Sequence, residues 1–127
     1  MQFLDRVFDM AKKRPARIVF PEAGDARVAE AMAQLAVEGV CEPVVLGDVS
    51  EAQVAALVAA RGMKEAMARR LLSKPLYQAA AMVAAGEADA MVAGADSSTK
   101  RVIEAAAMAI GPAEGVATAS SFFVMLF

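Results

Sequence analysis

Short apolar segments alternate along this chain with longer stretches of helical periodicity, and this alternation is the strongest constraint on its fold. Residues 17–21, 43–47 and 89–94 have the length and apolar character of buried strands, and each precedes a turn and a helical stretch. Strands that are joined through helices pair in parallel, because a parallel connection needs a long crossover. We therefore expect one α/β domain over residues 1–127, a three-layer sandwich with a mostly parallel sheet.

Helix-terminating residues divide the segments between these strands. Gly39 and Gly62 follow two helical stretches, and Lys74 is expected to separate two helices because it precedes a proline. Ser50 and Gln53 have the spacing of a capping box, which opens the helix between the two glycines. The expected helices lie at residues 2–13, 26–38 and 51–61, as one or two helices within 63–86, and after residue 99 up to 110–112.

A fourth apolar segment, residues 116–127, is expected to form a further strand. Its end, residues 122–127, is entirely apolar and is not followed by a turn signal or a polar tail. A strand this apolar belongs in the middle of a sheet, with neighbours on both sides. We therefore expect the chain to be a truncated or split gene product.

Composition and charge exclude several functional classes. The apolar runs 79–85 and 122–127 are far shorter than the roughly 18 residues that a membrane span requires, so we expect no membrane segment. The first 13 residues carry charges throughout, unlike a secretory signal, which predicts a cytoplasmic protein. A net charge of -2 argues against a nucleic-acid partner, because such a surface is normally basic.

The chain has no histidine, which excludes Ser-His-Asp and Cys-His catalysis and makes a conventional zinc site improbable, so we expect no metal. Cys41 is the single cysteine and cannot form an internal disulfide. We interpret it as a small buried apolar residue without a chemical role.

The segment after the third strand carries the pattern best suited to a ligand. A glycine lets the backbone approach a ligand closely, hydroxyls donate hydrogen bonds, and the next helix directs its free N–H groups to the same place. Cations in the first turn oppose the helix dipole, and a bound anion such as phosphate would explain them. The candidate phosphate- or CoA-binding residues here are Gly94, Ser97, Ser98, Thr99, Lys100 and Arg101.

A helix cap explains the same residues without a ligand, and on spacing alone we favour the cap over the phosphate site. The loop at residues 21–25 places a carboxylate on each side of Gly24, with Arg27 following. Ser120 and Ser121 also stand as ligand candidates, although hydroxyls entering a strand can simply satisfy backbone groups, and we favour that interpretation.

These same segments resemble, in order, the motifs of the phosphate acetyl/butyryltransferase (phosphotransacetylase) family, and the resemblance extends over essentially the whole chain. It identifies the chain as similar to the N-terminal portion of that family. The implied fold is Rossmann-like, an incomplete version of the first domain of phosphotransacetylases and isocitrate dehydrogenases. The motifs are residues 17–22 with Asp25, Arg27 and Val28, then residues 90–99, Ile110, Gly111, Gly115 and residues 120–123.

The resemblance implies transfer of an acetyl or other short acyl group between coenzyme A and inorganic phosphate. CoA, phosphate and acyl phosphate are then substrates, and no cofactor is implied. Family members are more than twice as long and place the active site between two domains. The resemblance implies that residues 97–99, Ser120 and Ser121 are the binding residues that this chain contributes to the active site. It identifies no catalytic residue. We expect the 127-residue chain alone to be inactive in acyl transfer, and we expect it to form a homo-oligomer.

One position departs from the family pattern. Several members carry an arginine in the first turns of the helix after the loop, where this chain has Glu104. Either Lys100 and Arg101 supply the positive charge instead, or the activity has been lost. The alternative function is a non-catalytic module for binding CoA or phosphate or for oligomerisation, comparable to the phosphotransacetylase-like regions of some malic enzymes.

Overall fold

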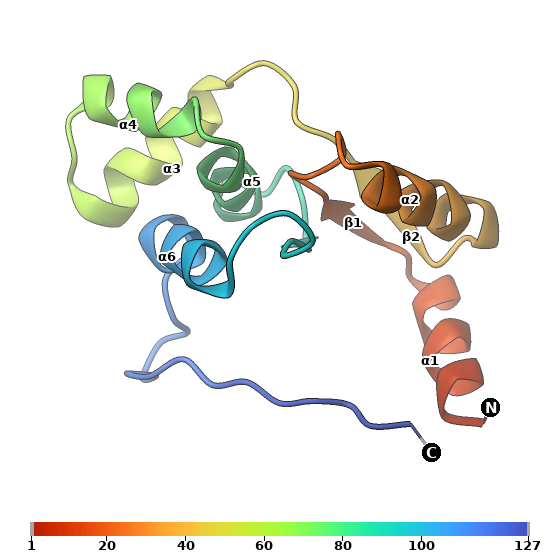
Figure 1. Ribbon diagram of the computed structural model, residues 1–127. Coiled ribbons are helices and arrows are strands. Elements are labelled where there is room, and N and C mark those ends of the chain that lie inside the picture. The colour runs from red at the N-terminus through yellow and green to blue at the C-terminus, as the bar shows by residue number, and fades with distance from the viewer. Residues whose placement is uncertain (1, 127) are drawn as a thin grey trace.

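The structure is a computed structural model that describes residues 2–126, and its centre is a small parallel sheet (Figure 1). The sheet has the order β2-β1-β3, formed by β1 (Ala16–Val19), β2 (Cys41–Val44) and β3 (Ala90–Met91). Both neighbours of β1 run parallel to it, with Ala16 opposite Cys41 and Ile18 opposite Ala90. The predicted parallel α/β architecture is therefore confirmed, although the strands are shorter than the sequence pattern suggested.

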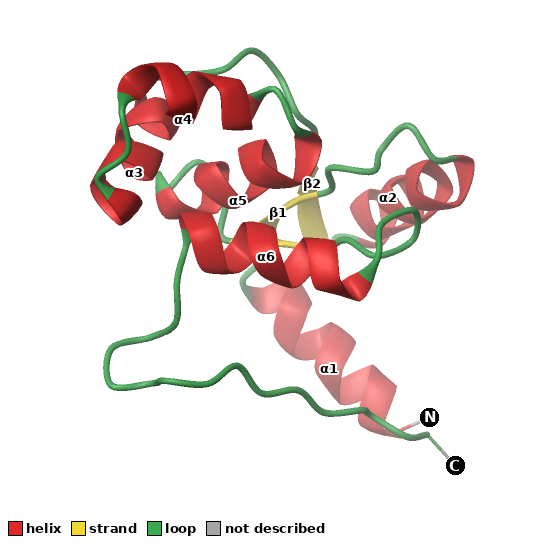
Figure 2. Ribbon diagram, turned by 60° about the vertical axis from the view of Figure 1, so that its left-hand side comes forward, coloured by secondary structure: helices red, strands yellow, loops and turns green. Residues whose placement is uncertain are grey.

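Five of the six helices of the described residues lie on the two sides of this sheet. Helix α2 lies on one side, whereas α3, α4, α5 and α6 gather on the other, and α1 extends away from the body of the chain (Figures 1 and 2). The segment within residues 63–86 forms two helices that separate at Ser73 and Lys74, as the proline predicted. The helices are α1 (Gln2–Lys13), α2 (Ala26–Glu38), α3 (Glu51–Arg61), α4 (Glu65–Leu72), α5 (Pro75–Ala84) and α6 (Thr99–Ala109).

Capping residues explain where the helices around the sheet begin and end. Asp25 caps α2 by accepting a hydrogen bond from the backbone N–H of Arg27. Ser50 and Gln53 form the predicted capping box at α3, with each side chain bonded to the other residue's backbone N–H. Gly39 and Gly62 end α2 and α3 in the left-handed conformation, with φ of 71° and 61°, which glycine adopts without a steric cost.

The core is built on alanine, which lets the helices pack closely. Leu57 of α3 and Leu72 of α4 are fully buried against alanines of α5 and α6. A second cluster joins α5 to the sheet, where Val19 packs with Ala79 and Met82. Cys41 of β2 is also buried, and burial raises the pKa of its thiol, which agrees with the predicted apolar role.

Polar contacts hold α5 and α6 in place beside the sheet. The buried amide of Gln78 in α5 donates to the Gly47 carbonyl at 2.8 Å, which ties α5 to the loop after β2. The guanidinium of Arg61 in α3 donates to the carbonyl of Ala107 at 2.8 Å, which satisfies an otherwise free carbonyl near the C-terminus of α6. The loop after β2 therefore anchors α5, and α3 anchors the end of α6.

The predicted fourth strand is wrong for the part of it that the structure describes. Residues 116–126 run as an extended segment without strand pairing, and Phe122 and Phe123 are 85% and 93% exposed. The apolar pattern was typical of a strand, but a strand also requires a neighbour that offers a matching row of N–H and C=O groups. Residue 127 lies outside the described residues.

Replacing a buried leucine should test this core. We expect Leu72→Ala to lower the free energy of unfolding by about 2–5 kcal/mol, because it removes a fully buried side chain and leaves a cavity. Met67→Ala on the same helix should change it by less than about 0.5 kcal/mol, because Met67 is 52% exposed. Urea unfolding followed by circular dichroism measures both. Equal effects of the two substitutions would contradict the described packing of α4.

Candidate functional site

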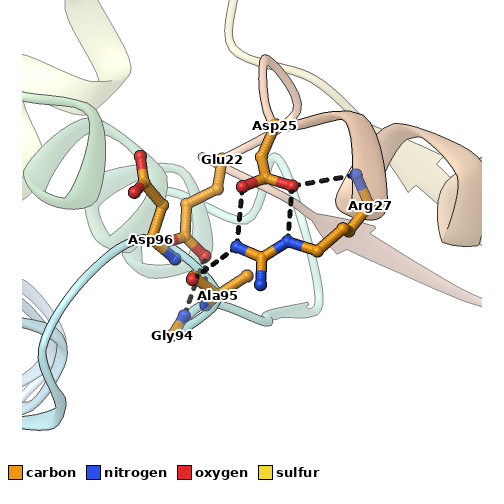
Figure 3. Close-up of polar contacts among 6 residues, drawn as sticks. All are labelled: Glu22, Asp25, Arg27, Gly94, Ala95 and Asp96. Carbon is orange, nitrogen blue, oxygen red and sulfur yellow. Dashed lines mark hydrogen bonds and ion pairs between the residues drawn. The ribbon is translucent and has the colours of Figure 1, made fainter.

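The loops that leave β1 and β3 meet at one edge of the sheet, and Glu22 joins them (Figure 3). Its carboxylate accepts hydrogen bonds from three consecutive backbone N–H groups, those of Gly94 at 2.8 Å, Ala95 at 3.1 Å and Asp96 at 2.6 Å. Partial burial alone would raise the pKa of Glu22, but these bonds, with one from the Ser97 hydroxyl, outweigh it and hold the pKa below its ordinary value. Glu22 is therefore an internal anion bound by the loop.

A second contact connects the same loops. The guanidinium of Arg27 forms an ion pair with Asp25 at 2.9 Å and donates to the Ala95 carbonyl, also at 2.9 Å (Figure 3). Hydrogen bonds from the Arg27 side chain and then from its backbone N–H lower the pKa of Asp25 to about 2. The loop after β3 is therefore held through its N–H groups by a carboxylate and through a carbonyl by a guanidinium.

A cavity of about 400 Å³ lies beside this junction, between the start of α5 and the first turns of α6. Two cations, Lys74 and Arg101, line it together with the Ser97 hydroxyl. Within the described residues no side chain caps the N-terminus of α5. Pro75 has no N–H, so the uncapped donors there are the backbone N–H groups of Leu76 and Tyr77. The complete lining consists of Lys74, Pro75, Leu76, Tyr77, Ser97, Arg101 and Glu104.

A second hollow, of about 310 Å³, continues this cavity toward the loop after β1. The two share Pro75, Leu76 and Ser97, and the second also reaches Glu22 and Asp25. Together they form a groove along the carboxyl edge of the sheet, where open parallel sheets bind their ligands. The groove is cationic at the end near Lys74 and acidic at the end near Glu22.

The residues predicted at 94–101 divide between structural and ligand-accessible positions. The N–H of Gly94 is bonded to Glu22, and Ser98 caps α6 by accepting from the Arg101 N–H, as the cap interpretation predicted. The side chain of Lys100 is 85% exposed, its ammonium lies 3.9 Å from the Glu104 carboxylate, and it does not line the cavity. Thr99 does not line the cavity either and is the first residue of α6. Ser97 and Arg101 are the members of the predicted set that line the cavity.

Ser120 and Ser121 lie in the extended segment after α6, apart from this groove. Ser120 contributes to a different cavity, of about 430 Å³, that is lined mainly by apolar residues of α6 such as Ile103 and by residues 116–119. The structure therefore does not bring the two serines together with Ser97 and Arg101.

Sequence reasoning missed the roles of three residues of the groove. In the sequence, Lys74 marked a helix break and Tyr77 was an ordinary helical residue. Tertiary packing brings both opposite Arg101. The Lys74 ammonium lies 5.8 Å from the centre of the Tyr77 ring. Glu22 was noticed as a loop carboxylate, but its partners are more than 70 residues away. A signal for Lys74 existed, because a helix that begins at Pro75 without a capping side chain leaves N–H groups open.

The fold and the groove together define an α/β protein with a polar binding groove at the carboxyl edge of a parallel sheet. The family described as phosphate acetyl/butaryl transferase matches residues 2–57 and 50–127, and the chain belongs to this family. Among its relatives, a phosphate acetyltransferase of Paracoccus denitrificans is 35% identical over 144 residues, and one of Acetivibrio thermocellus is 31% identical over 154 residues. Both alignments cover 99% of this chain.

Solved structures agree with the fold. A phosphotransacetylase from Streptococcus pyogenes and the EutD phosphotransacetylase from Staphylococcus aureus each superpose with a TM-score of 0.77 over 90% of this chain, at 24% and 27% identity. The chain spans less than half of the length of these proteins, 45% and 44%. It spans about the same share of the phosphate acetyltransferases of Paracoccus denitrificans and Acetivibrio thermocellus, 45% and 46%. An NADP-dependent malic enzyme of Escherichia coli also matches 98% of the chain, at 27% identity, with 21% of its own length.

The Asp25–Arg27 pair predicts a pH dependence of stability. The pKa of Asp25 is about 2 in the folded chain and about 3.9 in unfolded chains, so its contribution is complete above about pH 4 and is lost as the pH falls toward 2. NMR titration of the Asp25 carboxyl carbon should give a pKa near 2 in the wild type and a value nearer to 4 in Arg27→Gln.

Arg6→Gln on α1 is the matched control, because it removes an arginine that does not belong to this contact. We expect it to leave the titration of Asp25 unchanged. An Asp25 pKa that stays near 2 after loss of Arg27 would contradict the assignment of the shift to this guanidinium.

Proposed function

We propose that this chain contributes the phosphate-binding side of an acyltransferase that moves an acetyl or other short acyl group between coenzyme A and inorganic phosphate. The observation that carries the proposal is the cavity where Lys74, Ser97 and Arg101 converge at the uncapped start of α5. Free helix N–H groups and cations are the donors that bind phosphoryl oxygens. Membership of the phosphate acetyl/butaryl transferase family supports the same substrate class.

In the proposed reaction the CoA thiolate attacks the carbonyl carbon of the acyl phosphate. The bond from that carbon to the bridging oxygen then breaks, which forms a thioester and releases inorganic phosphate. Negative charge grows on the leaving phosphate, so cations placed at its oxygens stabilise the transition state more than the ground state. We assign this role to Lys74 and Arg101, and we assign no catalytic base to this chain.

Glu104 limits where the phosphate can bind in this cavity. Its carboxylate lines the same cavity as Arg101, and the nearby Lys100 offsets part of its charge at 3.9 Å. The lining carries two cations and one anion, which leaves a net positive charge toward Lys74. We therefore place the phosphate at the Lys74 and Ser97 end rather than along α6, where a carboxylate would repel it.

A non-catalytic role is the second candidate function. The match of nearly the whole chain to part of an NADP-dependent malic enzyme supports it, because this fold then also occurs within a protein named for a different reaction. In this alternative the groove binds CoA or phosphate without turnover, or the domain serves assembly.

We also propose that the chain is cytoplasmic and forms a homo-oligomer. Among the described residues no helix is long and apolar enough to cross a membrane. Exposed apolar side chains support self-association: Phe3 and Met10 on α1, and Phe122 and Phe123 near the end of the chain.

Charge removal in the cavity tests the proposed phosphate site. We expect Arg101→Gln and Lys74→Gln each to weaken the binding of inorganic phosphate and of CoA about tenfold, because each removes a charge-assisted hydrogen bond. Isothermal titration calorimetry measures the affinities. Lys100→Gln is the comparison variant and should lose much less affinity, because Lys100 does not line the cavity and acts on it only by offsetting the charge of Glu104.

Saturable phosphate binding that is unchanged in Arg101→Gln and Lys74→Gln would place the site elsewhere. A loss in Lys100→Gln as large as in Arg101→Gln would instead favour the first turn of α6 as a whole. Absence of any phosphate or CoA binding by the wild type would reject the proposed function. An assay of acetyl transfer from acetyl phosphate to CoA separates the catalytic from the non-catalytic alternative.

Sedimentation velocity at micromolar concentration tests self-association, and we expect a species larger than the monomer. The double variant Phe122→Ser, Phe123→Ser should shift the population toward monomer, because it removes two highly exposed aromatic side chains. Val37→Ser on α2 is the control, since Val37 is an exposed apolar residue outside that segment. A monomeric wild type would contradict this proposal.

A further inference from the structure

The loop after β3 forms an anion-binding arrangement that the protein itself fills. Three consecutive N–H groups converging on one acceptor form a concave donor set of the kind that binds phosphate and other anions. Here the acceptor is Glu22, at 2.6–3.1 Å from the three nitrogens (Figure 3). The N–H groups of the loop where the sequence pattern suggested a phosphate are therefore already bonded to a carboxylate.

An external phosphate is at a disadvantage in competing for these donors. Glu22 is attached to the end of β1, whose pairing with β3 keeps it beside the loop, so its effective concentration far exceeds that of a dissolved anion. Arg27, in the first turn of α2, adds a second restraint by donating to the Ala95 carbonyl. Glu22 and Arg27 therefore both hold the backbone of residues 94–96.

The restrained loop leads directly into the residues that line the cavity. Asp96 is followed by Ser97, which lines the cavity, and Ser98 starts α6 by accepting from the Arg101 N–H. The path of the peptide at 94–96 therefore determines where the Ser97 hydroxyl and the first turn of α6 lie. A shift of this peptide would move Ser97 and Arg101 relative to Lys74, which belongs to a different element.

We propose that Glu22 is a positioning residue: its carboxylate fixes the loop at 94–96 and thereby holds Ser97 and Arg101 opposite Lys74 in the ligand cavity. The proposal rests on the proposed function in taking that cavity as the phosphate site. It assigns the backbone N–H groups of Gly94, Ala95 and Asp96 to internal structure and excludes them from substrate binding.

Amide NMR tests the contact itself, without any ligand. In the wild type the amide signals of Gly94, Ala95 and Asp96 should titrate together, with one shared midpoint below the usual range for glutamate, since the carboxylate must be ionised to accept all three bonds. In Glu22→Gln this titration should vanish, and hydrogen exchange of these amides should accelerate about tenfold or more. Glu22→Asp keeps the charge on a shorter side chain and should restore part of the protection.

Glu38→Gln, which neutralises an exposed carboxylate on α2, is the control and should leave the three amides unchanged. Amides that do not titrate, or whose exchange is the same in Glu22→Gln as in the wild type, would overturn the proposal. These measurements do not depend on ligand binding, so they decide about Glu22 even if the wild type fails to bind phosphate.

Phosphate and CoA titrations then separate a positioning residue from a competitor. A positioning role predicts that Glu22→Gln binds inorganic phosphate about tenfold more weakly than the wild type, while Glu22→Asp recovers part of the affinity. A gain in phosphate affinity in Glu22→Gln would overturn the proposal, because it would show that the vacated N–H groups are themselves the phosphate site.

Discussion

Parallel pairing on both sides of β1 is the constraint on which the rest of this structure depends. Because β1, β2 and β3 all point the same way, the loops that follow β1 and β3 emerge at one edge, although more than 70 residues separate them. The helices are arranged by the same constraint, since each crossover must return along a face of the sheet. The groove lies where this edge meets the start of α5.

The alanine-rich packing explains how so short a sheet can support a defined groove. Buried alanines of α5 and α6 allow these helices to lie close to each other and to α3 and α4, around Leu57 and Leu72. The close approach brings the first residues of α5 beside the first turn of α6. Lys74 and Arg101, which come from separate helices, consequently line one cavity.

The charged side chains at the two ends of the groove have different partners. At one end, Glu22 satisfies the N–H groups of the loop after β3, and Arg27 is paired with Asp25. At the other end, Lys74 and Arg101 line open space and have donors to spare for a ligand. The first set stabilises the loops and the second set is available for binding, so the two ends of the groove have different roles.

Local sequence determined most of the secondary structure, whereas only the tertiary structure decided the site. Capping residues and glycines act on their own neighbours, so Ser50, Gly39 and Gly62 marked helix boundaries that the structure confirms. The contact of Glu22 with Gly94 and the meeting of Lys74 with Arg101 join residues that are distant in sequence, and a periodicity over a few residues contains no information about them. The segment at 116–126 has the apolar pattern of a strand, yet pairing with a neighbour is what makes a strand, and the described chain supplies none there.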